Sequence, residues 1–184
     1  MLQIPFFRVR IVKEALRKDN SYIQHAAIHT LDNYLIENGI DAMVVAPKCT
    51  KGNSWATISK YVYSMIDSLV VDKNIDGSRI YLMGTSFGAQ GGWSLLSERP
   101  DLFAAAQLAS AAPKRYVFEN VIKTPIYFTL GENDKDNPED YKKTIKKFRK
   151  AGAEIVFKIL PGLNHMQACN HAYTAESIEF LLKH

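Results

Sequence analysis

A chain of 184 residues, 47% of them hydrophobic, has enough apolar material for one core but is short for two separate domains. Lysine and arginine total 23 against 19 acidic residues, and a formal net charge of +4 is too small to indicate a nucleic-acid-binding protein. The sequence contains no apolar run of about 18 residues and no signal-peptide pattern. We therefore expect a single domain over residues 1–184 that neither binds a membrane nor carries a targeting signal, with a cytoplasmic location by default.

Short apolar runs alternate with helical patterns along the whole chain. The apolar runs predict strands at residues 6–12, 42–46, 79–83, 104–109, 125–130 and 154–160. The helical patterns lie at residues 22–38, 55–73, 89–96, 141–151 and 172–183. This alternation predicts an α/β fold: a three-layer α/β/α sandwich with a mostly parallel sheet of about six strands.

The third predicted strand runs directly into a Gly-x-Ser-x-Gly motif, Gly84-Thr85-Ser86-Phe87-Gly88. The two glycines leave room for the tight strand-to-helix turn that exposes a nucleophilic serine. The helix that follows would direct the positive end of its dipole at a developing oxyanion. The motif therefore predicts Ser86 as a nucleophile and the backbone N–H of Phe87 as one oxyanion donor.

A serine nucleophile needs a histidine base, and that histidine needs an acid that fixes its tautomer. The loop after residues 125–130 supplies the acid, and we choose Asp134 because it lies four residues past the expected strand end, after Gly131. The other carboxylates of this region are Glu132, Asp136, Glu139 and Asp140. Asp136 or Asn137, just before Pro138, is expected to cap the next helix instead.

The predicted base is His165, which lies in a turn just past the last predicted strand. His171 is the alternative, since it follows six residues later, near the start of the last helix. The remaining histidines are excluded by position: His25 and His29 lie upstream on a predicted helix, and His184 is the last residue.

Two other groups of residues are given ordinary roles. Basic residues alternate with apolar ones at residues 141–150, which indicates a solvated helix face rather than a nucleic-acid site. Cys49 and Cys169 lack metal-ligand and C-x-x-C spacing, and they leave open at most one disulfide. We expect neither a metal nor an organic cofactor.

The chain resembles the α/β-hydrolase fold, and more narrowly the bacterial esterases and peptidases grouped with dienelactone hydrolases, feruloyl esterases and prolyl-oligopeptidase-like domains. The resemblance extends over roughly residues 40–184 and includes Trp55, the stretch 75–88, the stretch 99–105 and the turns at 131–134 and 161–165. It implies a Ser86-Asp134-His165 triad. We also expect Trp55 and Thr85, which belong to this pattern, to bind the substrate.

The N-terminal part departs from that pattern. Such enzymes carry a His-Gly-Gly-like turn that supplies a second oxyanion donor, but here the corresponding place reads Lys13-Glu14-Ala15 and no glycine occurs before Gly39. The antiparallel strands that usually open the fold are also missing, which predicts an N-terminally reduced hydrolase fold with an incomplete or remodelled oxyanion hole and low esterase activity.

Three functions remain at this point. The first is a serine carboxylesterase that acts on a small or carbohydrate-linked ester, the second is a catalytically weak hydrolase-fold binding protein, and the third is a peptidase of the same fold. The expected partner is a small-molecule ester, and the sequence leaves a homodimer open.

Overall fold

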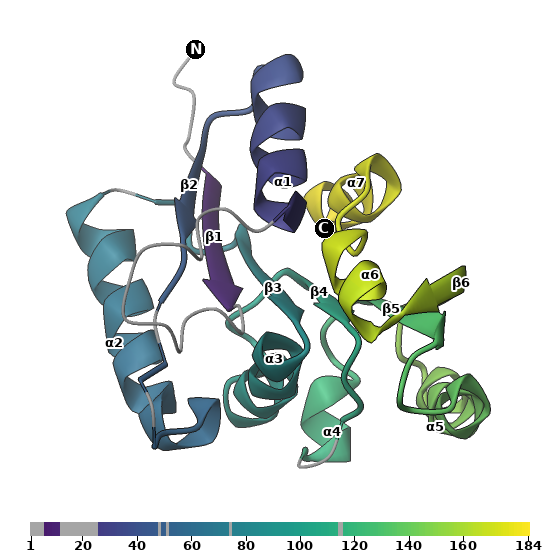
Figure 1. The fold of residues 1–184 in the computed structure, drawn as a ribbon. Coiled ribbons are helices and arrows are strands. Elements are labelled where there is room, and N and C mark those ends of the chain that lie inside the picture. The colour runs from purple at the N-terminus through teal and green to yellow at the C-terminus, as the bar shows by residue number, and fades with distance from the viewer. Residues whose placement is uncertain (1–5, 12–25, 48, 51, 74, 114–115) are drawn as a thin grey trace.

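The computed structural model describes residues 6–11, 26–47, 49–50, 52–73, 75–113 and 116–184 (Figure 1). Its centre is a six-stranded sheet with the strand order β2-β1-β3-β4-β5-β6. Each neighbouring pair of strands is parallel, which confirms the predicted parallel sheet. The strands are β1 (Phe6–Ile11), β2 (Ala42–Val45), β3 (Ile80–Thr85), β4 (Ala105–Ala109), β5 (Ile126–Asn133) and β6 (Ile155–Asn164).

Helices cover both faces of this sheet (Figure 1). One hydrophobic cluster joins the sheet to side chains of α2, α3, α4 and α5, and a second cluster joins the opposite face to α1 and α7. This arrangement confirms the three layers that the sequence predicts. The helices are α1 (Ala26–Glu37), α2 (Trp55–Asp72), α3 (Phe87–Glu98), α4 (Phe118–Val121), α5 (Pro138–Lys150), α6 (His165–Asn170) and α7 (Ala175–Lys183).

Strand β3 shows why the apolar runs of this chain form central strands. Ile80 and Leu82 belong to the first cluster, whereas Tyr81 and Met83 belong to the second. Successive side chains of a strand point to opposite faces of the sheet, so a continuous apolar run buries both. Every residue of β3 is buried.

Several element boundaries differ from the sequence prediction, and capping residues account for most of the differences. Helix α5 begins at Pro138 because the Asn137 side chain accepts a hydrogen bond from the Glu139 amide, which confirms the expected cap. Helix α7 begins three residues later than predicted, at Ala175, because Thr174 forms a capping box with Ser177. Helices α4 and α6 were not predicted at all.

The order of the strands places a topological switch point between β1 and β3. The chain passes from β1 outward to β2 and then returns to the other side of β1 to form β3. In a parallel sheet, such a switch in direction opens a crevice at the carboxyl ends of the strands, where ligands bind. Ser86 follows β3 at this edge.

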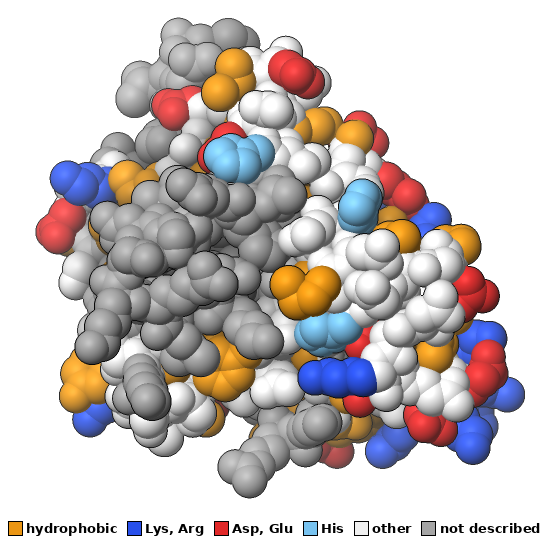
Figure 2. Space-filling view, viewed as in Figure 1, with side chains coloured by type: hydrophobic (Ala, Val, Ile, Leu, Met, Phe, Trp, Pro, Cys, Tyr) orange, Lys and Arg blue, Asp and Glu red, His pale blue; other side chains and the backbone are white. Residues whose placement is uncertain are grey.

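The exposed surface of α5 carries the basic residues noted in the sequence. In Figure 2, Lys and Arg side chains gather near the lower right, the area of α5 in Figure 1, and acidic side chains lie among them. Among the helices that the structure describes, none is both long enough and apolar enough to cross a bilayer.

Candidate active site

Ser86 sits on a strained turn between β3 and α3. Its backbone has φ 51° and ψ −116°, a conformation that L-residues rarely adopt and that costs about 1–3 kcal/mol. Gly84 makes the turn sterically feasible, because a Cβ there would lie 2.7 Å from both the carbonyl carbon and the oxygen of Gly88. The Ser86 amide donates to the Ala109 carbonyl at 2.8 Å, which fixes the turn to β4.

Gly84→Ala tests this steric argument. The added methyl group collides with backbone that cannot rotate away, so we expect the free energy of unfolding to fall by about 1–3 kcal/mol, as overpacking does elsewhere. Denaturant titration measures it. Gly77→Ala is the matched control, because a Cβ at Gly77 would meet only Val70 Cγ1, at 3.8 Å. Equal stability of the two variants would contradict the argument.

Two hydrogen bonds connect Ser86 to His165 and Asp134. Ser86 Oγ lies 2.9 Å from His165 Nε2, and His165 Nδ1 lies 2.8 Å from Asp134 Oδ1. Both distances fall within the reach that proton transfer requires. A carboxylate at Nδ1 holds the imidazole proton there and leaves the Nε2 lone pair facing the serine hydroxyl.

The three side chains differ in exposure. The Asp134 side chain is 0% exposed and that of His165 is 19% exposed, while Ser86 is 8% exposed. Asp134 Oδ1 also accepts from the Lys135 amide at 2.7 Å, but its Oδ2 is buried without a hydrogen-bond partner. The Asp134 carboxylate is therefore shielded from water, Ser86 is nearly so, and His165 is the most exposed of the three side chains.

The strand ends explain why these residues meet. Strands β5 and β6 extend further than predicted, and Asp134 and His165 are the first residues after them. Asp134 is thus adjacent to its strand, not four residues beyond it. The carboxyl ends of neighbouring parallel strands lie at one edge of the sheet, and this brings the two side chains together.

Contacts between the ends of β5 and β6 reinforce that arrangement. Glu132 Oε2 accepts from the Gly162 amide at 2.7 Å, and Asn133 Nδ2 donates to the Gly162 carbonyl at 3.1 Å. A Cβ at Gly131 would lie 2.4 Å from the Leu163 carbonyl oxygen, so the two backbones approach more closely than any other residue would allow.

The alternative residues have other partners. Asp136 accepts from the Tyr141 hydroxyl, and Glu132 is bound to Gly162. His171 is exposed, and its Nδ1 bonds to the Gln167 carbonyl at 2.8 Å. None of them contacts Ser86 in any hydrogen bond of the described residues.

The first turn of α3 supplies backbone donors next to Ser86. The first i→i−4 bond of this helix runs from the Gln90 amide to the Ser86 carbonyl, so the Phe87 amide precedes the internal bonding of the helix. The segment Lys13-Glu14-Ala15, where the sequence lacks the glycine turn that would supply a second donor, lies outside the described residues. Ile11, the last residue of β1, pairs with Gly84, two residues before Ser86. The incomplete or remodelled oxyanion hole therefore stays a prediction.

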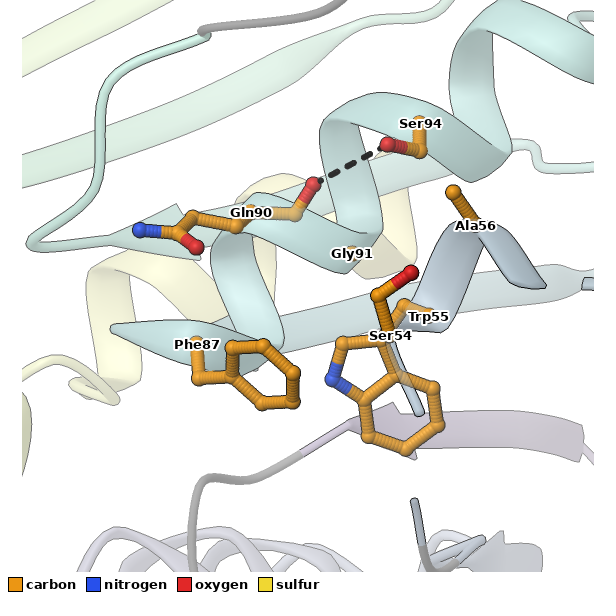
Figure 3. A pocket seen from close by; sticks show the side chains of 7 residues that line it. All are labelled: Ser54, Trp55, Ala56, Phe87, Gln90, Gly91 and Ser94. Atoms are coloured by element: carbon orange, nitrogen blue, oxygen red, sulfur yellow. Dashed lines mark hydrogen bonds between the residues drawn. The ribbon is translucent and has the colours of Figure 1, made fainter. Parts of the chain in front are cut away.

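A pocket of ≈ 200 Å³ adjoins Phe87 (Figure 3). Trp55 and Phe87 form an aromatic pair with ring centroids 6.2 Å apart, and the Trp55 Nε1 atom is buried with no hydrogen-bond partner among the described residues. Thr85 is 1% exposed and is not among the described residues that line this pocket. The lining residues are Ser54, Trp55, Ala56, Phe87, Gln90, Gly91 and Ser94.

Burial and charge perturb some titratable groups near this edge. Burial raises the pKa of the Tyr141 hydroxyl, as do a hydrogen bond to Asp136 and the charges of Asp136 and Asp134. Burial also raises the pKa of the Cys49 thiol, so this thiol is not activated as a nucleophile. Within the described part of the chain, no three His, Cys, Asp or Glu side chains are arranged to hold a metal ion.

Comparison with solved structures finds the same fold in other proteins. A thermostable esterase superposes with a TM-score of 0.82 at 24% identity, covering 98% of this chain and 55% of that chain. Esterase PE8 superposes with a TM-score of 0.66 at 16% identity, covering 88% and 85% of the two chains. Arabidopsis thaliana SOBER1 superposes with a TM-score of 0.70 at 16% identity, covering 97% and 98%. This chain thus spans about half the length of the thermostable esterase.

The sequence comparisons identify the family. No curated protein matches the chain. Residues 18–179 match the dienelactone hydrolase family, and this range includes Ser86, Asp134 and His165. The chain therefore belongs to the dienelactone hydrolase family, within the α/β-hydrolase superfamily.

Proposed function

We propose that the protein is a serine carboxylesterase in which Ser86 is the nucleophile, His165 the general base and Asp134 the residue that orients His165. One observation carries the proposal: hydrogen bonds of 2.9 and 2.8 Å connect these three side chains, each of which follows a different strand. This is the arrangement that activates a serine hydroxyl, since the base lies within reach of the nucleophile and is itself oriented by a third group.

The reaction proceeds through an acyl-enzyme. His165 Nε2 takes the proton as Ser86 Oγ attacks the ester carbonyl, and the Phe87 amide donates to the resulting oxyanion. The protonated His165 then gives its proton to the departing alcohol. Water, deprotonated by His165 in the same way, attacks the acyl group and releases the acid together with free Ser86.

The pocket beside Phe87 would hold one end of the ester. Its ≈ 200 Å³ is less than the about 300–1,000 Å³ of pockets that bind drug-sized ligands, so a compact group fits it. Its aromatic members, Trp55 and Phe87, would contact the apolar part of that group. We place substrate binding here, with Trp55 as the central residue.

Gly91→Ala tests that placement. A Cβ at Gly91 would lie 2.3 Å from Trp55 Cγ, so the indole must move and the pocket must change shape. We expect the KM for short-chain nitrophenyl esters to rise about tenfold, which corresponds to the about 1–3 kcal/mol that one misfitted methylene costs in an apolar pocket. Steady-state kinetics over acetate, butyrate and hexanoate esters measures it.

The control for this variant is again Gly77→Ala, whose Cβ meets only an ordinary contact. It should leave the KM of every ester unchanged. If Gly91→Ala retains the wild-type KM for all three esters, then the pocket beside Phe87 does not bind the substrate.

A fluorophosphonate probe tests the nucleophile without knowledge of the substrate. We expect the wild-type protein to be labelled and the modified peptide to contain Ser86. Labelling of a different serine, or the absence of any labelling, would refute the proposed esterase function.

A second candidate function is supported by the sequence at Lys13-Glu14-Ala15, where a glycine turn is absent. If the second oxyanion donor is missing, turnover falls by about 10²- to 10³-fold, and the cleft would serve binding more than catalysis. Wild-type turnover of nitrophenyl esters within the ordinary enzyme range of about 1–10³ s⁻¹ would exclude this binding function.

A further inference from the structure

The connection between β5 and α5 carries Asp134 and is only four residues long, from residue 134 to residue 137. Its first residue is held by β5, and its last, Asn137, is held by the cap of α5. Between these two ends, Asp136 accepts a hydrogen bond from the Tyr141 hydroxyl, with a distance of 2.7 Å to Asp136 Oδ2. This bond fixes the middle of the connection.

The ring of Tyr141 is a rigid support for that bond. It lies in the first hydrophobic cluster, is 5% exposed, and stacks on Phe128 of β5 with ring centroids 5.6 Å apart. Two χ angles define the position of a tyrosine hydroxyl, and both are fixed when the ring is packed. The hydroxyl is therefore a fixed point to which Asp136 is attached.

The hydroxyl also lies at the meeting point of two loops. The Ala112 backbone, in the loop after β4, lowers the pKa of the Tyr141 hydroxyl, whereas the charges of Asp136 and Asp134 raise it, so groups from both loops lie near this hydroxyl. Ala111 of the same loop accepts a hydrogen bond from Trp93 Nε1 at 2.9 Å, so this loop is itself held by α3. Tyr141 thus lies close to the loop that α3 holds and is bonded to the loop that carries Asp134.

Asp134 needs such external support. Among the described residues, its Oδ2 has no hydrogen-bond partner, and its Oδ1 bonds to the Lys135 amide and to His165. A buried carboxylate with an unpaired oxygen gains by moving toward water or a donor. The backbone that carries it must therefore be restrained.

We infer that Tyr141 is a positioning residue for the proposed esterase, holding Asp134 in line with His165 through its hydrogen bond to Asp136. This inference rests on the proposed function, because it assigns Tyr141 to the same triad. Tyr141 does not touch the substrate, so its loss should lower kcat while KM stays the same.

Tyr141→Phe removes the hydroxyl and leaves the stacked ring. We expect the rate of fluorophosphonate labelling and the kcat for nitrophenyl acetate to fall by about 10- to 100-fold, the range that a misplacement of about 1 Å produces. Asp136→Ala should give a similar loss. The double variant should lose no more than either single variant, because both substitutions break the same bond.

Asp136→Asn separates the hydrogen bond from the carboxylate charge. Its side-chain oxygen can still accept from Tyr141, so we expect it to retain activity within about threefold of the wild type. Tyr63→Phe is the matched control, since the Tyr63 hydroxyl also donates to a protein acceptor, Leu95 O at 3.2 Å, but joins α2 to α3. It should label at the wild-type rate.

The outcomes separate this inference from the proposed function. If the wild type is labelled at Ser86 and Tyr141→Phe is labelled equally fast, then the positioning role is refuted and the esterase stands. The positioning role would also be refuted if Asp136→Asn lost as much activity as Asp136→Ala. In that case the hydrogen bond from Tyr141 would be retained and would have no effect on activity. A wild type that is not labelled refutes both. Thermal unfolding of each variant, recorded beside the kinetics, confirms that the folded protein is being compared.

Discussion

Ser86→Ala is expected to lower ester turnover by about 10⁴- to 10⁶-fold, the range found when a triad nucleophile is removed. In the proposed mechanism the Ser86 hydroxyl oxygen forms the acyl bond, and alanine has no atom that can take its place. Alanine at φ 51° bears the same backbone strain as serine, so the fold should be retained. Initial rates of nitrophenyl ester hydrolysis, with fluorophosphonate labelling as a second measurement, give the result.

The control for this variant is Ser68→Ala, on the exposed side of α2, which should keep both the rate and the label. Labelling of the Ser86→Ala protein at the wild-type rate would show that another residue is the nucleophile.

Asp134→Asn is expected to lower turnover by about 10⁴-fold without loss of stability. An amide at this position can donate to His165 Nδ1, which moves the imidazole proton to Nε2, where it can no longer accept the serine proton. The same change removes a fully buried charge whose Oδ2 has no partner, so the free energy of unfolding should equal or exceed that of the wild type.

Ester kinetics and urea denaturation of Asp134→Asn measure these two effects separately. A variant that loses activity only in proportion to a loss of stability would indicate that Asp134 has a structural role alone. Retention of more than about a tenth of wild-type turnover would exclude it as the residue that orients His165.

The tight turn at Ser86 and the positions of Asp134 and His165 were predictable because each depends on local sequence. A glycine is required at position 84, because a Cβ there would lie 2.7 Å from the backbone of Gly88, and such a requirement is visible in the residue types themselves. The acid and the histidine follow apolar runs, and parallel strands bring such positions to one edge. The hydrogen bonds at 2.9 and 2.8 Å agree with that prediction.

Other features depend on contacts between distant segments, or on short signals that an apolar pattern does not contain. Helix α6 is capped by Asn164, which forms a capping box with Gln167, and the spacing of these two residues could have predicted where the helix starts. Its six residues are too few to show a hydrophobic period. The extension of β5 to Asn133 comes from pairing with Asn164 of β6, beyond the apolar run. The bond from Tyr141 to Asp136 depends on where α5 packs, which no local pattern gives.

The position of His165 has a consequence for how the protein loses activity. Strand β6 pairs with β5 alone among the described strands, so it forms an edge of the sheet, whereas β3, which carries Ser86, has a strand on each side. Edge elements with fewer neighbours open at a lower free energy than central ones. Opening of β6 separates His165 from Ser86 while the central strands stay folded. In the proposed esterase, we therefore expect catalytic inactivation to precede global unfolding, so that activity is lost before any spectroscopic signal from the core of the sheet changes.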